Sequence, residues 1–109
     1  MLEMARRRVS NFPKERSYRH CAIVVRGGAI LSVGVNAGST HAEVAALEQL
    51  AWSERRGTTV YSLRIRKDGS LAMGKPCVRC MAYMREYGVK KIVYSLSNGT
   101  MLKERIRYG

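Results

Sequence analysis

Hydrophobic and polar positions follow a different period in successive parts of the chain, and each period predicts one kind of element. Residues 1–20 are polar and basic, and a short helix is expected in their first part. Residues 20–36 hold two apolar runs rich in β-branched residues around Gly27-Gly28, a dipeptide that supplies the positive φ of a tight hairpin turn. The pattern therefore predicts a β-hairpin behind a basic N-terminal segment.

The spacing of apolar residues becomes helical in residues 40–57. Four apolar side chains of this segment share one helical face, namely Val44, Leu47, Leu50 and Ala51. Gly57 can end this helix, because glycine readily adopts the left-handed conformation that follows a last helical turn. A second helix is predicted over 76–87, with Pro76 at its first position and Gly88 just past its end.

Strands are expected before and after the second helix. Residues 59–66 form a strand, residues 90–96 form a buried one, and the turn sequence SNG leads into a last strand before residue 107. Strands separated by helices indicate an α/β class with a mixed sheet of about five strands and helices packed on it. We expect a single domain over 21–109, preceded by a basic arm or short helix over 1–20. Both helices would begin at the same edge of the sheet.

Composition narrows the class of protein. The chain has 109 residues, of which 46% are hydrophobic, enough for the buried core of one domain. No apolar run approaches the length of a membrane span, and the start of the chain does not resemble a secretory signal. Three cysteines, an odd number, favour reduced thiols over a disulfide framework. We therefore expect a cytoplasmic protein that does not associate with membranes.

The net charge of +12 is typical of a protein that binds polyanions. Six basic residues gather in the first 20 positions, namely Arg6, Arg7, Arg8, Lys14, Arg16 and Arg19. Phosphate is the expected ligand, and charge alone does not distinguish a free nucleotide from a nucleic-acid strand. The alternative is a solvated surface that keeps the protein soluble.

Cys77 and Cys80 lie three positions apart at the predicted start of the second helix, so both sulfurs can reach one ion. His41 stands at the start of the first helix. One imidazole and two thiolates form a zinc site with an open fourth position, as in catalytic rather than structural zinc sites. The partial positive charge at helix N-termini is expected to lower the pKa of both thiols.

Each of these residues also has a simpler interpretation. Glu43 fits a capping box with Thr40. His41 alone could be a helix-start hydrogen-bonding residue, and Cys77 with Cys80 could be a redox pair. The combination of the two helix-start motifs is what favours a metal site.

The sequence HAE at 41–43 and the sequence PCVRC at 76–80 together resemble the zinc-dependent nucleobase deaminase superfamily. This superfamily includes the cytidine, deoxycytidylate and tRNA-adenosine deaminases and their polynucleotide-editing relatives. The resemblance implies a cytidine-deaminase-like three-layer domain and one Zn²⁺ per chain, held by His41, Cys77 and Cys80.

The same resemblance implies functions for further residues. Glu43 would be the catalytic residue, taking a proton from the attacking water and returning it to the base. Asn36, the backbone N–H of Ala42, and Pro76 would bind substrate, although Asn36 beside a glycine-containing segment also fits a turn. His20 is interpreted as a polar residue at a strand end rather than a fourth ligand.

The end of the chain favours one type of base. Two antiparallel strands at the C-terminus resemble the free-nucleoside cytidine deaminases more than the adenosine and polynucleotide-editing branches. The predicted function is hydrolytic deamination of a cytosine-type base in a nucleoside or nucleotide. One alternative is the same reaction on single-stranded DNA or RNA, with Phe12, Tyr18 or Trp52 stacking on a base. A second is a non-catalytic zinc module that binds nucleic acid. The sequence leaves the oligomeric state open, a homo-oligomer included.

Overall fold

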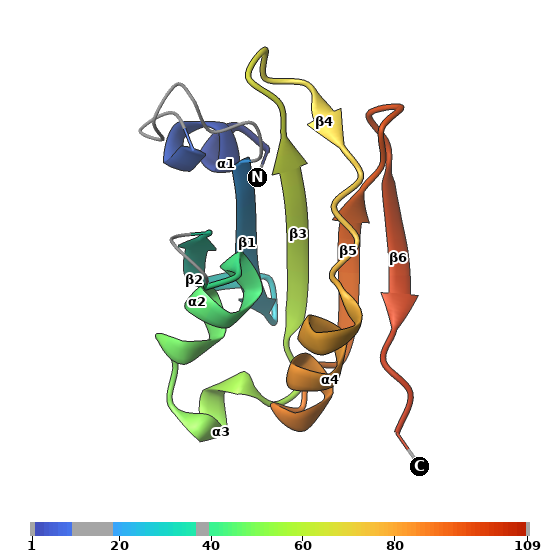
Figure 1. Cartoon of the computed structure of the whole chain (residues 1–109). Coiled ribbons are helices and arrows are strands. Elements are labelled where there is room, and N and C mark those ends of the chain that lie inside the picture. The colour runs from blue at the N-terminus through green and yellow to red at the C-terminus, as the bar shows by residue number, and fades with distance from the viewer. Residues whose placement is uncertain (1, 10–18, 37–39, 109) are drawn as a thin grey trace.

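A computed structural model describes residues 2–9, 19–36 and 40–108. Its strands form one mixed sheet in the order β2-β1-β3-β5-β6, with a short β4 paired to β3 (Figure 1). The strands are β1 (Arg19–Arg26), β2 (Ala29–Val35), β3 (Thr59–Ile65), β4 (Leu71–Ala72), β5 (Lys91–Ser95) and β6 (Met101–Arg105). β3 and β5 are parallel, and every other pair is antiparallel. The predicted mixed sheet and the antiparallel last strand are confirmed.

The predicted hairpin turn is also present. β1 and β2 are joined at Gly27 and Gly28, which have φ values of 59° and 81°. Left-handed backbone at two successive positions is the geometry that glycine allows without steric cost. A turn follows β3, where the N–H of Gly69 donates to the backbone oxygen of Arg66, and the short β4 after it was not predicted.

Helices lie on both faces of the sheet, which gives three layers. The helices are α1 (Leu2–Val9), α2 (Ala42–Glu48), α3 (Trp52–Arg55) and α4 (Val78–Glu86). α2 and α4 pack on one face, where Ala22 and Val24 of β1 are buried. α1 packs on the other face through Ala5 and Val9, against a cluster that includes Ile23. The alternation of side chains along β1 thus supplies both cores.

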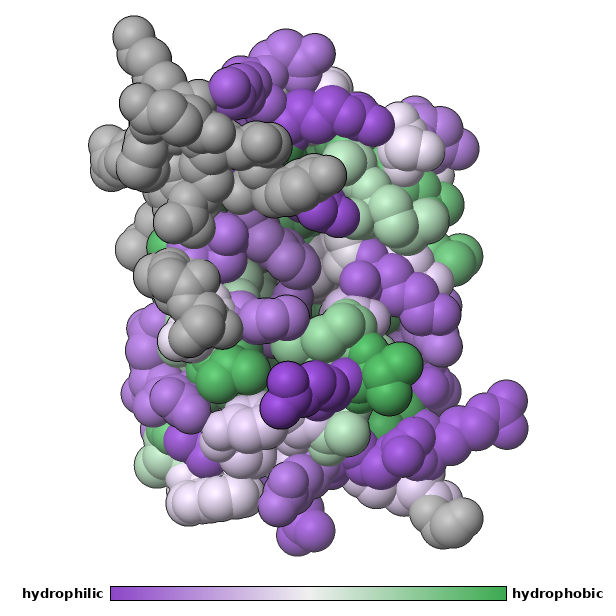
Figure 2. Space-filling model, viewed as in Figure 1, coloured by the Kyte–Doolittle hydropathy of each residue, from purple (hydrophilic) through white to green (hydrophobic). Residues whose placement is uncertain are grey.

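Figure 2 shows hydrophilic side chains over much of the described surface on the side of α2 and α4, with apolar side chains exposed between them. Among the described residues, no helix has the length and apolar character needed to cross a membrane.

The single helix predicted over 40–57 is wrong, because the chain breaks between α2 and α3. Ala51 is extended, with φ −67° and ψ 156°, and its N–H donates to the carboxylate of Glu54 at 2.9 Å. The side chain of Arg55 donates to the backbone oxygen of Leu47 at 2.8 Å, which takes up a carbonyl at the end of α2. These side-chain hydrogen bonds take the place of the backbone hydrogen bonds that a continuous helix would form. Ala51, predicted on the apolar face of the helix, is exposed.

The start of the second predicted helix is shifted by two residues. Cys77 is the N-cap of α4, with extended φ −68° and ψ 168°, so Pro76 precedes the helix instead of occupying its first position. The helix ends as predicted, with Tyr87 as C-cap and Gly88 at φ 80°. The shift places Cys77 at the very start of the helix, where its side chain can turn toward α2.

Candidate metal and active site

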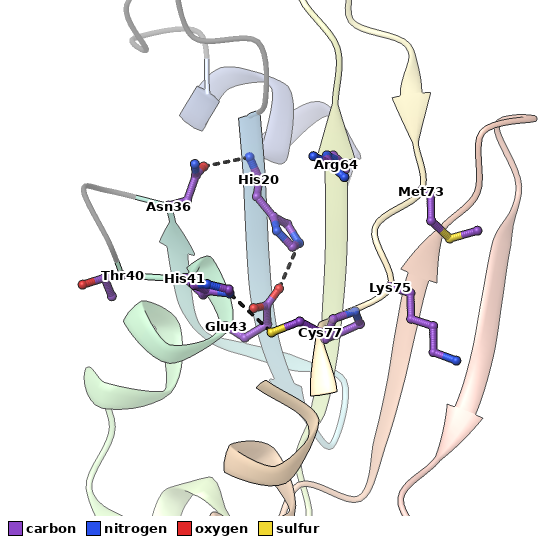
Figure 3. A pocket seen from close by; sticks show the side chains of 10 residues that line it. His20, Asn36, Thr40, His41, Glu43, Arg64, Met73, Lys75 and Cys77 are labelled. Atoms are coloured by element: carbon purple, nitrogen blue, oxygen red, sulfur yellow. Dashed lines mark hydrogen bonds and ion pairs between the residues drawn. The ribbon is translucent and has the colours of Figure 1, made fainter. Parts of the chain in front are cut away.

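The starts of α2 and α4 lie next to each other on one face of the sheet. This places His41 beside Cys77 (Figure 3) and, with Cys80 in the first turn of α4, brings three candidate ligands together. His41 is the N-cap of α2, and its Nδ1 atom lies 3.0 Å from Sγ of Cys80 and 3.9 Å from Sγ of Cys77. The donor atoms of these residues all lie within 4.8 Å of one another. The structure thus assembles the three predicted ligands.

The donor set fits a zinc ion. Zinc binds nitrogen at about 2.0 Å and sulfur at about 2.3 Å in a tetrahedron, which separates its ligand atoms by roughly 3 to 4 Å. The separations of 3.0 Å and 3.9 Å from the imidazole nitrogen agree with this geometry. With three protein ligands, a fourth position would stay open for water or substrate.

Glu43, the second residue of α2, turns inward and is fully buried. Its Oε1 atom lies 2.9 Å from Nε2 of His20 and 2.9 Å from the hydroxyl of Ser62. Its Oε2 atom is buried without a hydrogen-bond partner among the residues that the structure describes. The capping-box interpretation is therefore wrong, because the N-cap is His41 and the carboxylate points to the sheet.

The charge state of Glu43 is set by opposing effects. Burial raises the pKa of its carboxyl, but the hydrogen bond and charge of His20 lower it, as do Ser62 and the Cys80 thiol, and the net result is a pKa of about 2. Glu43 is thus a carboxylate near neutral pH. Figure 3 shows this carboxylate beside His41 and Cys77, next to the ligand set.

The thiol of Cys80 behaves differently from the sequence-based expectation. Burial raises its pKa, and the neighbouring Glu43 and Cys77 raise it further, so the helix N-terminus does not keep this thiol acidic. A bound cation reverses this balance, because a coordinating thiol is deprotonated by the metal.

A cavity of about 350 Å³ opens beside the ligand set (Figure 3). Its lining residues are His20, Asn36, Thr40, His41, Glu43, Arg64, Met73, Lys75, Pro76 and Cys77. Its volume lies in the range of about 300–1,000 Å³ usual for small-molecule sites. Arg64 and Lys75 are the basic residues of this lining, and the ammonium of Lys75 lies 3.7 Å from the carboxylate of Glu104 on β6.

Two of the residues predicted to bind substrate lie at the cavity, and their contacts with substrate stay predictions. Asn36 and Pro76 line the cavity, and Oδ1 of Asn36 accepts a 2.9 Å hydrogen bond from the backbone N–H of His20. Ala42 is the first residue of α2, where backbone N–H groups have no helical acceptor, and its substrate contact stays a prediction.

The structure does not bring Trp52 to the site. Trp52 is 63% exposed on α3 and lines neither cavity that includes His41. Phe12 and Tyr18, the other candidates for base stacking, lie outside the described residues, as do Lys14 and Arg16.

Sequence reasoning missed two residues of the site, His20 and Ser62. His20 is near the start of β1 and Ser62 is inside β3, far from both motifs in sequence. A histidine on an apolar strand was the available signal for the first, whereas nothing in the sequence distinguishes Ser62 from other strand serines.

Comparison with known proteins gives the family. Residues 1–96 match the profile described as the cytidine and deoxycytidylate deaminase zinc-binding region. The chain belongs to this family. No curated protein matches the sequence significantly.

Solved structures show the same fold. Cytidine deaminase from Mycobacterium leprae is 18% identical over 94% of this chain and 89% of its own, with a TM-score of 0.63. The dCMP deaminase of cyanophage S-TIM5 is 25% identical over 87% of this chain and 82% of its own, with a TM-score of 0.57. RibD from Acinetobacter baumannii is 24% identical over 87% of this chain, with a TM-score of 0.62, and this chain spans a quarter (25%) of that longer protein. The predicted deaminase-like fold is confirmed.

Proposed function

We propose that this protein is a zinc-dependent hydrolase that converts the cytosine base of a nucleoside or nucleotide to uracil, with release of ammonia. One observation carries the proposal. The donor atoms of His41, Cys77 and Cys80 lie within 4.8 Å of one another, and the buried carboxylate of Glu43 lies next to them. Family membership supports the same reaction class.

The metal ligands would be His41, Cys77 and Cys80, one ion per chain. A zinc ion bound there would lower the pKa of a coordinated water to about 7. Glu43 would move the protons: its carboxylate accepts one from the attacking water, then delivers it to the ring nitrogen, and a later transfer leads to departure of the amine as ammonia. Because Oε2 of Glu43 is buried and has no partner among the described residues, it is the oxygen available for that exchange.

Substrate binding would use the cavity beside Glu43. Asn36 and Pro76 would contact the nucleoside, and the N–H of Ala42 at the start of α2 would donate to the base carbonyl. Arg64 lines the same cavity, and its positive charge supports a substrate that carries phosphate. The antiparallel pairing of β5 and β6 supports cytosine over adenine, because this ending resembles the free-nucleoside cytidine deaminases.

The net charge of +12 favours a second candidate substrate, cytosine in single-stranded nucleic acid. It would use the same catalytic residues, with the basic surface along the strand. A non-catalytic zinc module is the weaker alternative, because a structural site commonly has four protein ligands and has no need of a buried carboxylate beside it.

The test is a substrate panel for the zinc-loaded protein. We expect uracil from cytidine, deoxycytidine or their monophosphates, and a lower rate on a cytosine-containing oligonucleotide. A rate highest on the oligonucleotide would favour the strand. Absence of uracil from every cytosine compound, with zinc bound, would contradict the proposed function.

A further inference from the structure

Two polar side chains of the sheet contact Glu43, and neither belongs to the metal ligands. His20 comes from β1 and Ser62 from β3, the strand paired with β1. Nε2 of His20 lies 2.9 Å from Oε1 of Glu43 and 2.6 Å from Oγ of Ser62. Ser62 is fully buried, and the His20 side chain is 20% exposed at the cavity (Figure 3). This cluster joins the sheet to the helix that carries Glu43.

The number of protons in the cluster is limited. The Ser62 hydroxyl lies 2.9 Å from Oε1 of Glu43, 2.7 Å from the backbone oxygen of Gly74 and 2.6 Å from Nε2 of His20. A carboxylate and a carbonyl only accept hydrogen bonds, whereas a hydroxyl has one proton to donate. Ser62 can therefore supply Glu43 or Gly74 at any moment, but not both.

The acceptor that Ser62 does not supply must receive its hydrogen bond from His20. If Nε2 of His20 carried no proton, its lone pair would face the lone pairs of Oε1 at 2.9 Å, and one buried oxygen would lack a donor. With the proton on Nε2 donated to Oε1 of Glu43, the Ser62 hydroxyl is free to donate to the backbone oxygen of Gly74, so both of these oxygens have a donor. The hydrogen-bond geometry thus requires a proton on Nε2, whether or not Nδ1 also carries one.

His20 is itself fixed in position. Its backbone N–H donates to Oδ1 of Asn36 at 2.9 Å, and its backbone oxygen accepts from the N–H of Asn36 at 3.2 Å. A carboxylate can exchange its two oxygens by rotation about its terminal bond, and a fixed donor at Oε1 opposes that rotation. Oε2 then stays as the oxygen without a partner among the described residues.

We propose that His20 and Ser62 are positioning residues of the active site: a proton on Nε2 of His20 and the Ser62 hydroxyl hold Oε1 of Glu43, and Oε2 carries the proton of the reaction. The catalytic part of this proposal rests on the proposed deamination. The position of the proton on His20 does not, and it can be measured separately.

The first experiment is ¹⁵N NMR of the imidazole rings in the zinc-loaded protein. The chain has two histidines, so the spectrum contains two ring systems, and His20→Gln assigns them. We expect Nε2 of His20 to be protonated and its resonance to shift in Glu43→Gln. A His20 ring with a bare Nε2 would overturn the proposal, and this holds even if no cytosine compound is deaminated.

The second experiment compares variants for kcat, KM, zinc content and thermal stability. His20→Leu removes the donor, and we expect kcat to fall roughly 10- to 100-fold, as for other misplaced catalytic groups, with zinc retained. His20→Gln places an amide N–H near the position of Nε2, so it should restore much of kcat. Equal losses of kcat in the two variants, or no loss in His20→Leu, would overturn the proposal.

Ser62→Ala has a matched control in Ser32→Ala. Ser32 is also a buried strand serine, and its hydroxyl donates to the backbone oxygen of Ala46 in α2 at 2.8 Å. Both variants should lower the melting temperature, but only Ser62→Ala should lower kcat. Equal effects of the two variants on kcat would show that Ser62 contributes to stability alone, and would contradict its proposed function in positioning Glu43.

Discussion

Gly34 of β2 faces the backbone of α2 at close range, and replacing it by alanine should disturb the metal site. A Cβ atom at this position would lie 2.4 Å from the backbone nitrogen of Ala46 and 2.6 Å from the backbone oxygen of Ala42. Ordinary contacts of such an atom begin at 3.4 Å, so the strand and helix must separate by about 1 Å. Because both contacts are with backbone, no side chain can rotate away.

The size of the effect follows from this displacement. Overpacking a core costs about 1–3 kcal/mol, and a backbone clash belongs at the upper end of that range. For a domain of this size, such a cost lowers the melting temperature by about 10 °C or more. His41 is the N-cap of the displaced helix, and a metal site tolerates errors of only about 0.2 Å in its ligand distances. We therefore expect zinc affinity to fall about tenfold or more in Gly34→Ala.

The assay combines thermal unfolding with zinc competition against a chromophoric chelator. Gly27→Ala is the matched control, because Gly27 has a positive φ of 59° but no heavy atom within 4 Å of the added Cβ. The control should lose about 1–2 kcal/mol of stability through backbone strain alone and keep wild-type zinc affinity. Wild-type stability and zinc affinity in Gly34→Ala, or equal losses of zinc affinity in both variants, would refute the reasoning.

Three further outcomes are expected. Cys80→Ala should lose zinc and melt at a lower temperature, whereas Cys21→Ala, which removes another buried thiol, should keep zinc in elemental analysis. In the metal-free protein, the carboxyl of Glu43 has a pKa of about 2 in the native state and 4.5 in the unfolded chain. Its ionisation therefore stabilises the native state fully above about pH 4.5, and this stabilisation is lost as the pH falls from 4.5 toward 2. At about 1.36 kcal/mol per pKa unit this is on the order of 3 kcal/mol, and urea unfolding should show a weaker acid dependence in Glu43→Gln; an unchanged dependence would contradict the assignment. For a free monophosphate, log affinity should change little with log salt, whereas a strand held through four phosphates would give a slope of about −3.

The fold was predictable where local signals agree with tertiary packing. Gly27-Gly28 requires a turn whatever surrounds it, and Gly88 ends α4 for the same conformational reason. The break after α2 was not predictable, because it depends on the hydrogen bond from Arg55 to Leu47 and on the capping of Ala51 by Glu54. Helical periodicity continues through that segment, and it carries no information about these contacts.

In the site, too, the residues with local sequence signals were predictable and those placed by tertiary contacts were not. His41, Cys77 and Cys80 belong to helix-start motifs, so their spacing already indicates a metal. His20 and Ser62 reach Glu43 through the pairing of β1 with β3, a register that no local pattern specifies. The raised pKa of Cys80 was also missed, because burial outweighs the helix N-terminus and burial depends on the packed structure.

The most direct test of the account measures zinc and deamination in the same samples of wild-type protein and Glu43→Gln. Glutamine keeps the size and hydrogen bonding of the side chain but removes the proton acceptor, so the variant should bind about one zinc per chain, as the wild type should. Uracil formation from a cytosine nucleotide should fall by roughly 10² or more in the variant. Wild-type rates in zinc-loaded Glu43→Gln would contradict the assignment of Glu43, and with it the proposed mechanism.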